Sequence, residues 1–409
     1  MKLFRNKIFL IVITIIFLLF SLQFYFISSS YKRDTNSYIT LISWAGKISR
    51  NTEYRPIILK VNEKQKIQNW DVVSTIWESL AVIEWWDKSI TRLWANSKVL
   101  IKENFVSDDL SKINISFELL KWRTWSNVIP IMLPNSYFKQ DINWVTAAVR
   151  WTVFEANYDN DYIQVHSHEV ELINVSWEKR ILYIWETFSI KNFSLQNIKN
   201  LVQDAFTKIN QKMDEEYLKI LRENFLSTFQ KTNPLNIVWK FSSENKVYNM
   251  LISGEKEKLK KYISSLSEDK KQKIINNLVF LSQSINFEKG EDSYLYNLKV
   301  NTRSLIVDNS QDNNLKETLV KYSIYDLSDI FSLKNFSNEV LINTISFISN
   351  NKEYIQKQKE NYEVLNQIFS IKKENLTLEN IKSKLLEIDA SWKNILNQSL
   401  NKILEIYKK

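Results

Sequence analysis

Residues 69–100 read NWDVVSTIWESLAVIEWWDKSITRLWANSKVL, and this stretch decides the predicted fold of the first half of the chain. It holds short apolar runs, such as SLAVIEW at 79–85, that partly alternate with polar residues and are separated by Asn, Asp and Ser. Similar runs follow at 114–120, 145–156 and 162–172. Runs spaced at about 8–12 residues are typical of all-β domains, so we predict roughly eight to twelve strands between Leu41 and Ile190.

The turns between these runs carry tryptophan where glycine is usual. Trp70, Trp144 and Trp177 directly follow Asn or Ser, although Asn-Gly and Ser-Gly are the common turn dipeptides. A positive φ costs glycine little and a bulky residue much, so an indole is a poor choice there. The alternative is that these are ordinary core or surface aromatics.

The composition of the whole chain narrows its possible functions. Its 409 residues are 44% hydrophobic, enough to bury a core in about two or three domains. The absence of Cys excludes disulfides, thiolate metal sites and a cysteine nucleophile, and only two His are present. The net charge of +9 is spread thinly without a basic stripe, which argues against nucleic-acid binding.

A membrane anchor is predicted near the N-terminus. Residues 8–27 carry no charge, and about twenty apolar residues suffice to span a bilayer as a helix. Basic residues at 2, 5 and 7 predict a cytoplasmic tail at 1–7, an anchor at 8–28 and an extracytoplasmic remainder in a single-pass cell-membrane protein. A cleaved signal peptide is the alternative.

The apolar period changes after about Phe193. From Leu195 to Phe225 apolar residues, among them Ile209 and Met213, recur at i, i+3, i+4 and i+7, which indicates a core-facing helix. The predicted fold class is therefore an α+β multidomain chain. An N-terminal transmembrane helix is followed by an all-β domain at 36–192, either a β-sandwich or a short β-roll, and by an all-α domain at 193–409.

Catalytic constellations are scarce. His166 and His168 would share one face of a strand, but Val170, next on that face, cannot bind a metal, and a solvated strand face is favoured. Residues 159–161 favour a hairpin turn over a cation site. We predict a non-enzymatic protein with no catalytic residue, no metal site and no cofactor; in the enzyme alternative, the residues to test are His166, Asp161 and Glu155.

Residues 69–100 resemble the FecR domain of bacterial envelope proteins. The family pattern is Gly-Asp, a hydrophobic residue, Thr-x-Gly, a strand, an Asp-Gly-Ser-like turn and Arg-Leu. Further on, residues 147–155 (AAVRWTVFE) are similar to the family's Val-Arg-Gly-Thr-x-Phe core, and 117–125 and 185–186 also fit, so the resemblance covers about 41–190. The residues that carry it are Trp70, Asp71, Thr75, Trp77, Asp87, Ser89, Arg92, Leu93, Trp122, Val149, Arg150, Trp151, Thr152, Phe154, Trp185 and Glu186.

Nearly every departure from the family pattern is tryptophan in place of glycine. UGA is read as glycine in some bacterial lineages and as tryptophan in others, so a gene of the first kind read with the second code would give this result. The hypothesis is that most of the 14 Trp are glycine in the native protein, while Trp125 and either Trp85 or Trp86 are true tryptophans. UGG codons at Trp70, Trp77, Trp122, Trp151 and Trp185 would contradict it.

The resemblance implies a structural role for residues 150–152, with a close backbone approach at Trp151 and a buried anchor at Arg150. It also implies a role at the cell envelope, either as a binding or scaffold module or, alternatively, as a signal transducer or sigma-factor regulator. Expected partners are the membrane and an envelope or surface protein or polysaccharide.

Overall fold

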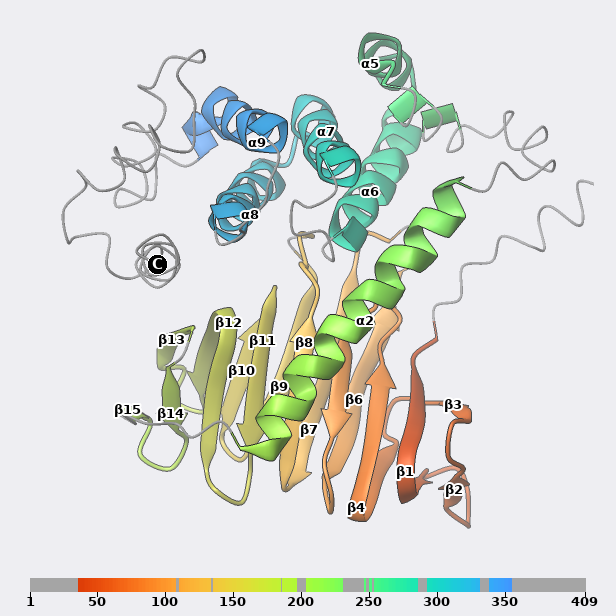
Figure 1. Cartoon of the computed structure of the whole chain (residues 1–409), viewed down its shortest axis with the longest axis vertical. Helices are drawn as coiled ribbons and strands as arrows, with labels where there is room; N and C mark the ends of the chain where they lie inside the picture. Colours follow the sequence, from red (N-terminus) through yellow and green to blue (C-terminus); the bar gives the residue numbers. More distant parts are fainter. Residues whose placement is uncertain are drawn as a thin grey trace, which may run out of the picture. The chain divides into compact units, whose positions relative to one another are not determined.

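The computed structural model describes residues 36–107, 110–133, 135–184, 186–196, 204–230, 246–247, 250–251, 254–285, 293–331 and 338–354. In these residues strands come first and helices follow (Figure 1). The fifteen strands exceed the predicted eight to twelve. They are β1 (Tyr38–Ser49), β2 (Ile57–Leu59), β3 (Lys64–Lys66), β4 (Val72–Glu84), β5 (Ile90–Leu93), β6 (Lys98–Val106), β7 (Ile113–Lys121), β8 (Arg123–Val128), β9 (Tyr137–Ile142), β10 (Val145–Val149), β11 (Thr152–Asn157), β12 (Tyr162–Asn174), β13 (Lys179–Tyr183), β14 (Thr187–Ser189) and β15 (Ser194–Gln196).

Nine of the strands close into a barrel. Their order is β10-β9-β7-β6-β4-β5-β8-β11-β12, and β10 pairs with β12 to complete the ring. The pairing is antiparallel throughout except between β7 and β9, which run parallel. β1 lies beside β4, outside the ring, and pairs on its other side with β2 and β3.

The closure depends on a bend that divides one predicted strand. Residues 145–156 were expected to form a single strand, but the chain bends at Arg150 and Trp151 and separates β10 from β11. β12 is 13 residues long, so its first part pairs with β11 and its last part with β10. β12 therefore pairs with both β11 and β10 and so closes the ring.

The predicted fold class was wrong in two respects. The β part is a closed barrel, because β10 pairs with β12, whereas a sandwich or a short roll was expected. No helix in the part of the chain that the structure describes is long and apolar enough to cross a membrane. The predicted tail at 1–7 and anchor at 8–28 lie outside the described residues, and we withdraw the anchor and the cell-membrane localisation derived from it. The predicted boundary between 36–192 and 193–409 stays a prediction.

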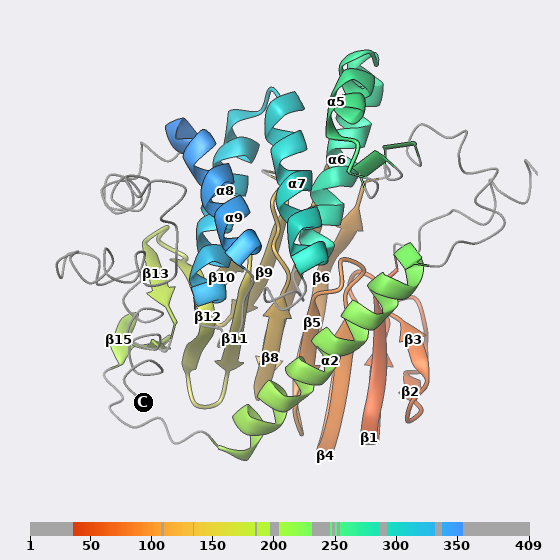
Figure 2. The same cartoon turned by 45° about the horizontal axis from the view of Figure 1, so that its top comes forward.

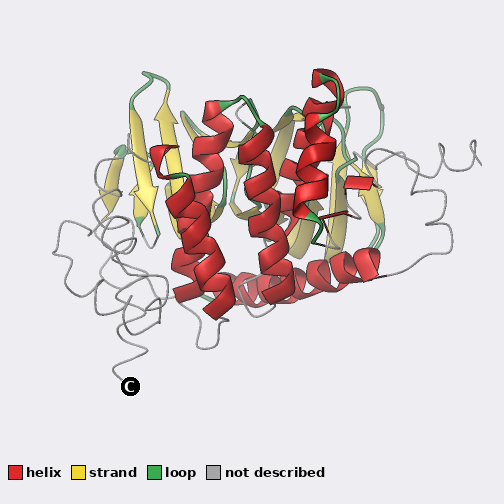
Figure 3. Cartoon of the chain, turned by 90° about the horizontal axis from the view of Figure 1, so that it is seen from above, coloured by secondary structure: helices red, strands yellow, loops and turns green. Residues whose placement is uncertain are grey.

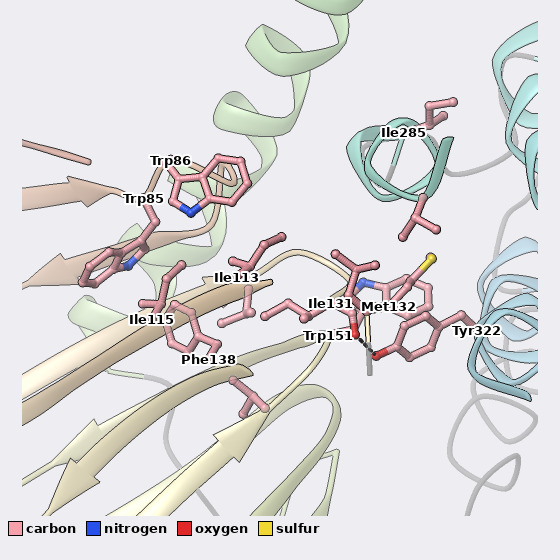
Figure 4. Close-up of a cluster of buried hydrophobic side chains, with 14 of the residues drawn as sticks. Trp85, Trp86, Ile113, Ile115, Ile131, Met132, Phe138, Trp151, Ile285 and Tyr322 are labelled. Atoms are coloured by element: carbon pink, nitrogen blue, oxygen red, sulfur yellow. Dashed lines mark hydrogen bonds between the residues drawn. The ribbon is translucent and has the colours of Figure 1, made fainter. Parts of the chain in front are cut away.

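The barrel interior is filled by aromatic and branched side chains (Figure 4). The Trp85 ring is fully buried, stacks on Phe117 at 5.5 Å between ring centroids and meets the edge of Phe138 at 6.0 Å. Its indole nitrogen donates a hydrogen bond to the Thr91 hydroxyl at 3.0 Å. A buried indole with a satisfied donor contributes packing without a desolvation penalty, so this tryptophan suits its position.

Six α-helices follow in the described residues: α2 (Ala205–Gln230), α5 (Lys256–Ser264), α6 (Glu268–Ser284), α7 (Ser293–Asn309), α8 (Asn313–Phe331) and α9 (Asn338–Asn350), with a short 3₁₀ helix, η2 (Lys352–Tyr354). Helices α6 to α9 lie alongside one another (Figure 3). Trp86 stacks on Phe280 of α6 at 5.6 Å, and the Tyr322 hydroxyl of α8 donates to the carbonyl of Ile131 (Figure 4). These contacts join the helices to the barrel.

Five tryptophans have a backbone conformation that favours glycine. Eleven of the 14 Trp lie in the described residues. A positive φ of between 47° and 70° occurs at Trp44, Trp70, Trp77, Trp122 and Trp177. L-residues with bulky side chains rarely adopt this region, because Cβ approaches the following carbonyl oxygen.

Three of these five positions are places where chains commonly use glycine. Trp70 is the third residue of the turn in which Asp71 N–H donates to the Gln68 carbonyl, and positive φ there is typical of a type II turn. Trp44 lies where the pairing of β1 with β4 is irregular, as at a β-bulge. Trp177 ends the turn between β12 and β13, and 80% of its surface is exposed.

Candidate functional site

The first group of motif residues holds the β4 region together. The Asp71 carboxylate is fully buried and accepts hydrogen bonds from Arg50 Nε at 2.7 Å and from the Gln68 N–H at 2.8 Å. The Thr75 hydroxyl accepts the Ser97 N–H at 3.0 Å and donates to the Trp94 carbonyl at 2.5 Å. The Asp71 and Thr75 side chains therefore connect β4 and its preceding turn to neighbouring loops by hydrogen bonds.

Asp87 and Ser89 close the turn between β4 and β5. The Ser89 N–H and hydroxyl both donate to the Asp87 carboxylate, at 2.9 and 3.0 Å, and the Ser89 hydroxyl in turn accepts the Ile129 N–H at 3.1 Å. Complete burial raises the pKa of Asp87 to about 6, because desolvation outweighs these hydrogen bonds. The Asp87 carboxylate therefore has a structural role, and its raised pKa follows from its burial.

A second group lies between the barrel and α2, which runs obliquely across the strands (Figures 1 and 2). We call it the α2 seam and define it as Arg92, Arg123, Trp125 and Glu155 of the barrel with Asp204, Thr207, Asn210 and Asp214 of the α2 segment. In the register of the sheet, Arg92 on β5 lies opposite Trp125 on β8, and Trp125 lies opposite Glu155 on β11. Strand alternation then places all three side chains on one face.

Asp214 is the centre of one half of the seam. Its carboxylate accepts hydrogen bonds from Arg92 Nη1 at 2.5 Å and from the Trp125 indole at 2.9 Å. The Arg92 side chain is only 2% exposed, so Asp214 is the counter-ion of a buried cation.

Arg123 and Glu155 form the other half. Arg123 Nε donates to Glu155 at 2.6 Å, and Nη1 donates to Asp204 at 2.5 Å. Burial raises the pKa of Glu155, but the nearby His166 and the hydrogen bonds from Arg123 and Tyr162 outweigh burial and hold the pKa below its usual value. The charged side chains of the seam are thus paired with one another and fix α2 against the barrel.

The buried face of α2 is more polar than predicted. Phe206 is buried and Leu218 and Leu221 pack on the core as expected, but polar residues lie between them. The period is helical as expected, but Asn210 is fully buried and Asp214 almost so, whereas Ile209 is 41% exposed. The helix turns polar residues toward the strand face because that face presents two arginines and a glutamate. The spacing of Thr207, Asn210 and Asp214 was visible in the sequence, but helical periodicity alone favoured the apolar stripe.

The two histidines do not form the predicted solvated face. His166 is 8% exposed, and its ring lies 4.4 Å from Trp125 and within 3.8 Å of Glu155. His168 has a φ of 56° beside a shift in the pairing of β11 with β12, and its ring stacks on Trp151 at 4.1 Å. Burial lowers the pKa of His168 to about 4. Across the described ranges, no group of three His, Cys, Asp or Glu could hold a metal ion.

The remaining motif residues are distributed over the same barrel. The expected buried anchor at Arg150 is wrong, because that residue is exposed at the bend, whereas Arg92 and Arg123 of the barrel are buried. The Thr152 hydroxyl donates to the Glu169 carbonyl at 2.6 Å, and the Glu186 carboxylate accepts the Tyr183 N–H at 2.8 Å. Leu93, Val149 and Phe154 are buried, Trp151 is 7% exposed, and Trp185 lies outside the described residues.

An open groove of about 460 Å³ lies away from the seam. It is formed on the outer face of β6, β7, β9 and β10 and beside the turn that follows β12. Its lining is Lys102, Ser116, Tyr137, Lys139, Asp141, Asn143, Trp144, Val145, Thr146, Ile173, Asn174, Val175 and Trp177. The volume falls in the range of small-molecule sites, roughly 300–1,000 Å³. None of the groove residues belongs to the motif, so sequence reasoning missed this surface.

No family model and no curated protein matches the chain. Two crystal structures of a "putative anti-sigma factor" from Parabacteroides distasonis ATCC 8503 are similar to part of it, with TM-scores of 0.26 and 0.25 and sequence identities of 16% and 14%. Each match covers 31% of this chain and 57% of the other, so the chain spans little more than half of those proteins. Similarity at this level does not establish a shared fold.

Proposed function

We propose that this chain is a non-enzymatic binding module of the FecR type, with the open groove as its binding surface. The observation that carries the proposal is that the motif residues bond within the chain, whereas the groove residues are partly exposed. Asp71, Thr75, Asp87, Arg92 and Thr152 each make hydrogen bonds within the chain and are buried. The motif therefore serves the architecture, and the groove offers half-exposed polar groups to a ligand.

The backbone at the motif's glycine positions supports the FecR resemblance. Four described tryptophans stand where the family has glycine; Trp70, Trp77 and Trp122 have positive φ, and Trp151 does not. This agreement comes from conformation and not from residue identity. A barrel that needs glycine at those positions is what the resemblance implies.

The groups considered for catalysis have structural partners. Glu155 is ion-paired with Arg123, and the Asp161 carboxylate accepts the Lys191 N–H across the turn. His166 packs on Trp125 beneath α2. A general base must reach a substrate, whereas Glu155 and His166 are buried and paired within the fold and Asp161 fastens a surface turn.

The proposal is tested by affinity capture on the immobilised full chain, with bound proteins and glycans identified by mass spectrometry. The groove variant is the double substitution Lys139→Met and Thr146→Val. Its matched control is Lys98→Met, an exposed strand lysine that does not line the groove. We expect a molecule retained by wild type and control and lost by the groove variant.

Two results would change the interpretation. Equal retention by all three proteins would overturn the groove as the binding surface. Retention of a sigma factor would replace the scaffold interpretation with the regulator alternative. That alternative needs a second readout, because loss of a regulator changes transcription and loss of a scaffold does not.

A further inference from the structure

The lining of the groove is polar, and its charged side chains contact one another or an aromatic ring. Lys102 Nζ lies 2.8 Å from Glu118 and 2.9 Å from Asp141, and the Thr146 hydroxyl donates to Asp141 at 2.6 Å. Lys139 Nζ lies over the ring of Tyr137, 4.2 Å from its centroid. The Tyr137 ring does not neutralise the charge of Lys139. An anionic ligand would meet Asp141 and Glu118 beside Lys102, and a cationic ligand would meet Lys139, so the lining matches neither sign of charge.

The groove offers hydrogen-bond donors and acceptors together. Ser116, Lys139 and Thr146 are half-buried on the outer face of their strands, while their neighbours Phe117 and Phe138 point into the core. The Asn143 amide adds both a donor and an acceptor at the rim. Partly buried polar groups of both kinds suit a ligand whose own groups both donate and accept.

The groove also has an apolar wall. Trp144 is half-buried, with its ring tilted against Phe193 at 5.5 Å between centroids, and Ile173 and Val175 line the same side. Aromatic rings bind the apolar face of a ligand while neighbouring polar groups bind its edge. Trp177 also borders the groove and, like Trp144, follows a turn residue, but only Trp177 has the positive φ that favours glycine, so we assign a ligand contact to Trp144 and none to Trp177.

From these three features we propose that the groove binds an uncharged, hydroxyl-rich ligand, namely a short segment of a neutral polysaccharide. Sugar hydroxyls donate and accept, and the C–H faces of the rings pack on aromatic and aliphatic side chains. The inference rests on the proposed binding function, and it adds the chemical class of the ligand.

The test is isothermal titration calorimetry on the full chain with four defined probes. Three are neutral tetrasaccharides, of β-1,4-linked N-acetylglucosamine, β-1,4-linked glucose and α-1,4-linked glucose. The fourth is a sulfated heparin tetrasaccharide. We expect saturable binding of at least one neutral probe and none of the sulfated probe at physiological salt.

Variants locate the binding. Thr146→Val, which changes a hydroxyl to a methyl group at constant shape, and Lys139→Met should each weaken binding at least tenfold, and Lys98→Met should stay within twofold of wild type. Equal thermal unfolding midpoints show that the variants are folded.

Three outcomes would overturn the inference: no saturable binding of any neutral probe, binding of the sulfated probe alone, or unchanged affinity in both groove variants. In each case the proposed binding function survives if capture from lysate still depends on Lys139 and Thr146. If capture fails as well, both fall.

Discussion

Replacing Trp177 by glycine and, separately, by alanine tests whether this position requires glycine. Both variants lose the same indole, so the difference between them isolates the backbone. The φ of 64° costs alanine roughly 1–2 kcal/mol of Cβ strain that glycine avoids. Glycine loses about 0.5–1 kcal/mol more chain entropy on folding. The balance favours the glycine variant by roughly 0.5–1 kcal/mol.

Trp144 supplies the matched control, since it also follows a turn residue and lines the same groove, but its φ is not positive. Without strain to relieve, the order reverses, and its alanine variant should be the more stable by roughly 0.5–1 kcal/mol. Urea unfolding monitored by circular dichroism gives both differences, and an unchanged m-value shows that the comparison is valid.

The effect should accumulate over the five positions. Trp44 and Trp77 lie near each other where β1 pairs with β4, and the other three, Trp70, Trp122 and Trp177, lie in separate connections between strands. Five increments of roughly 0.5–1 kcal/mol make the all-glycine version about 2.5–5 kcal/mol more stable than the all-alanine version, apart from coupling between Trp44 and Trp77. A more stable alanine variant at Trp177, and likewise at Trp70 and Trp77, would refute the reasoning. UGA codons at these positions in the gene would support the recoding hypothesis independently.

Three further predictions follow from the buried groups. Asp214→Ala should lose about 3–5 kcal/mol of unfolding free energy in urea because Arg92 stays buried without its counter-ion, whereas Glu63→Ala, which removes an exposed pair with Lys60, should lose less than about 1; equal losses would contradict the seam. Asp87 has a pKa of about 6 in the folded chain, so between pH 6.5 and 4 the folded state takes up a proton before the unfolded state does, and the free energy of unfolding rises as the pH falls. Asp87→Asn should remove roughly 2–3 kcal/mol of that rise in urea unfolding. Parallel pH profiles of wild type and variant would contradict this prediction. His168, with a pKa of about 4, has the opposite effect, because the unfolded state is protonated first and the wild-type chain loses stability as the pH falls. Measured against wild type in urea, the stability of His168→Gln should therefore be higher at pH 4 than at pH 7 by roughly 2–3 kcal/mol.

The α2 seam shows how far local pattern carries. Helical periodicity predicted a helix through Ile209 and Met213, and that helix exists. Phe206 of the predicted apolar stripe is buried as expected, but Ile209 is exposed and Asp214 shares the buried face, which the usual rule of an apolar stripe does not anticipate. Arg92 and Arg123 explain the polar part of that face, because buried guanidinium groups are costly unless they are paired with acidic side chains, here Asp214 and Asp204.

Local patterns in the sequence predicted a β-rich first half, a helical second half and two of the turn positions, Trp70 and Trp177, where the backbone is left-handed; Trp144, singled out in the same way, has no positive φ. Alternation and turn residues act over a few residues, which is why Trp70 and Trp177 could be recognised as misplaced before any coordinates. Only the tertiary structure decided that β12 pairs with both β10 and β11 and closes the barrel. It alone brought Lys102, Lys139 and Thr146 from three strands to one groove, because strand order and register depend on long-range pairing that local periodicity does not encode.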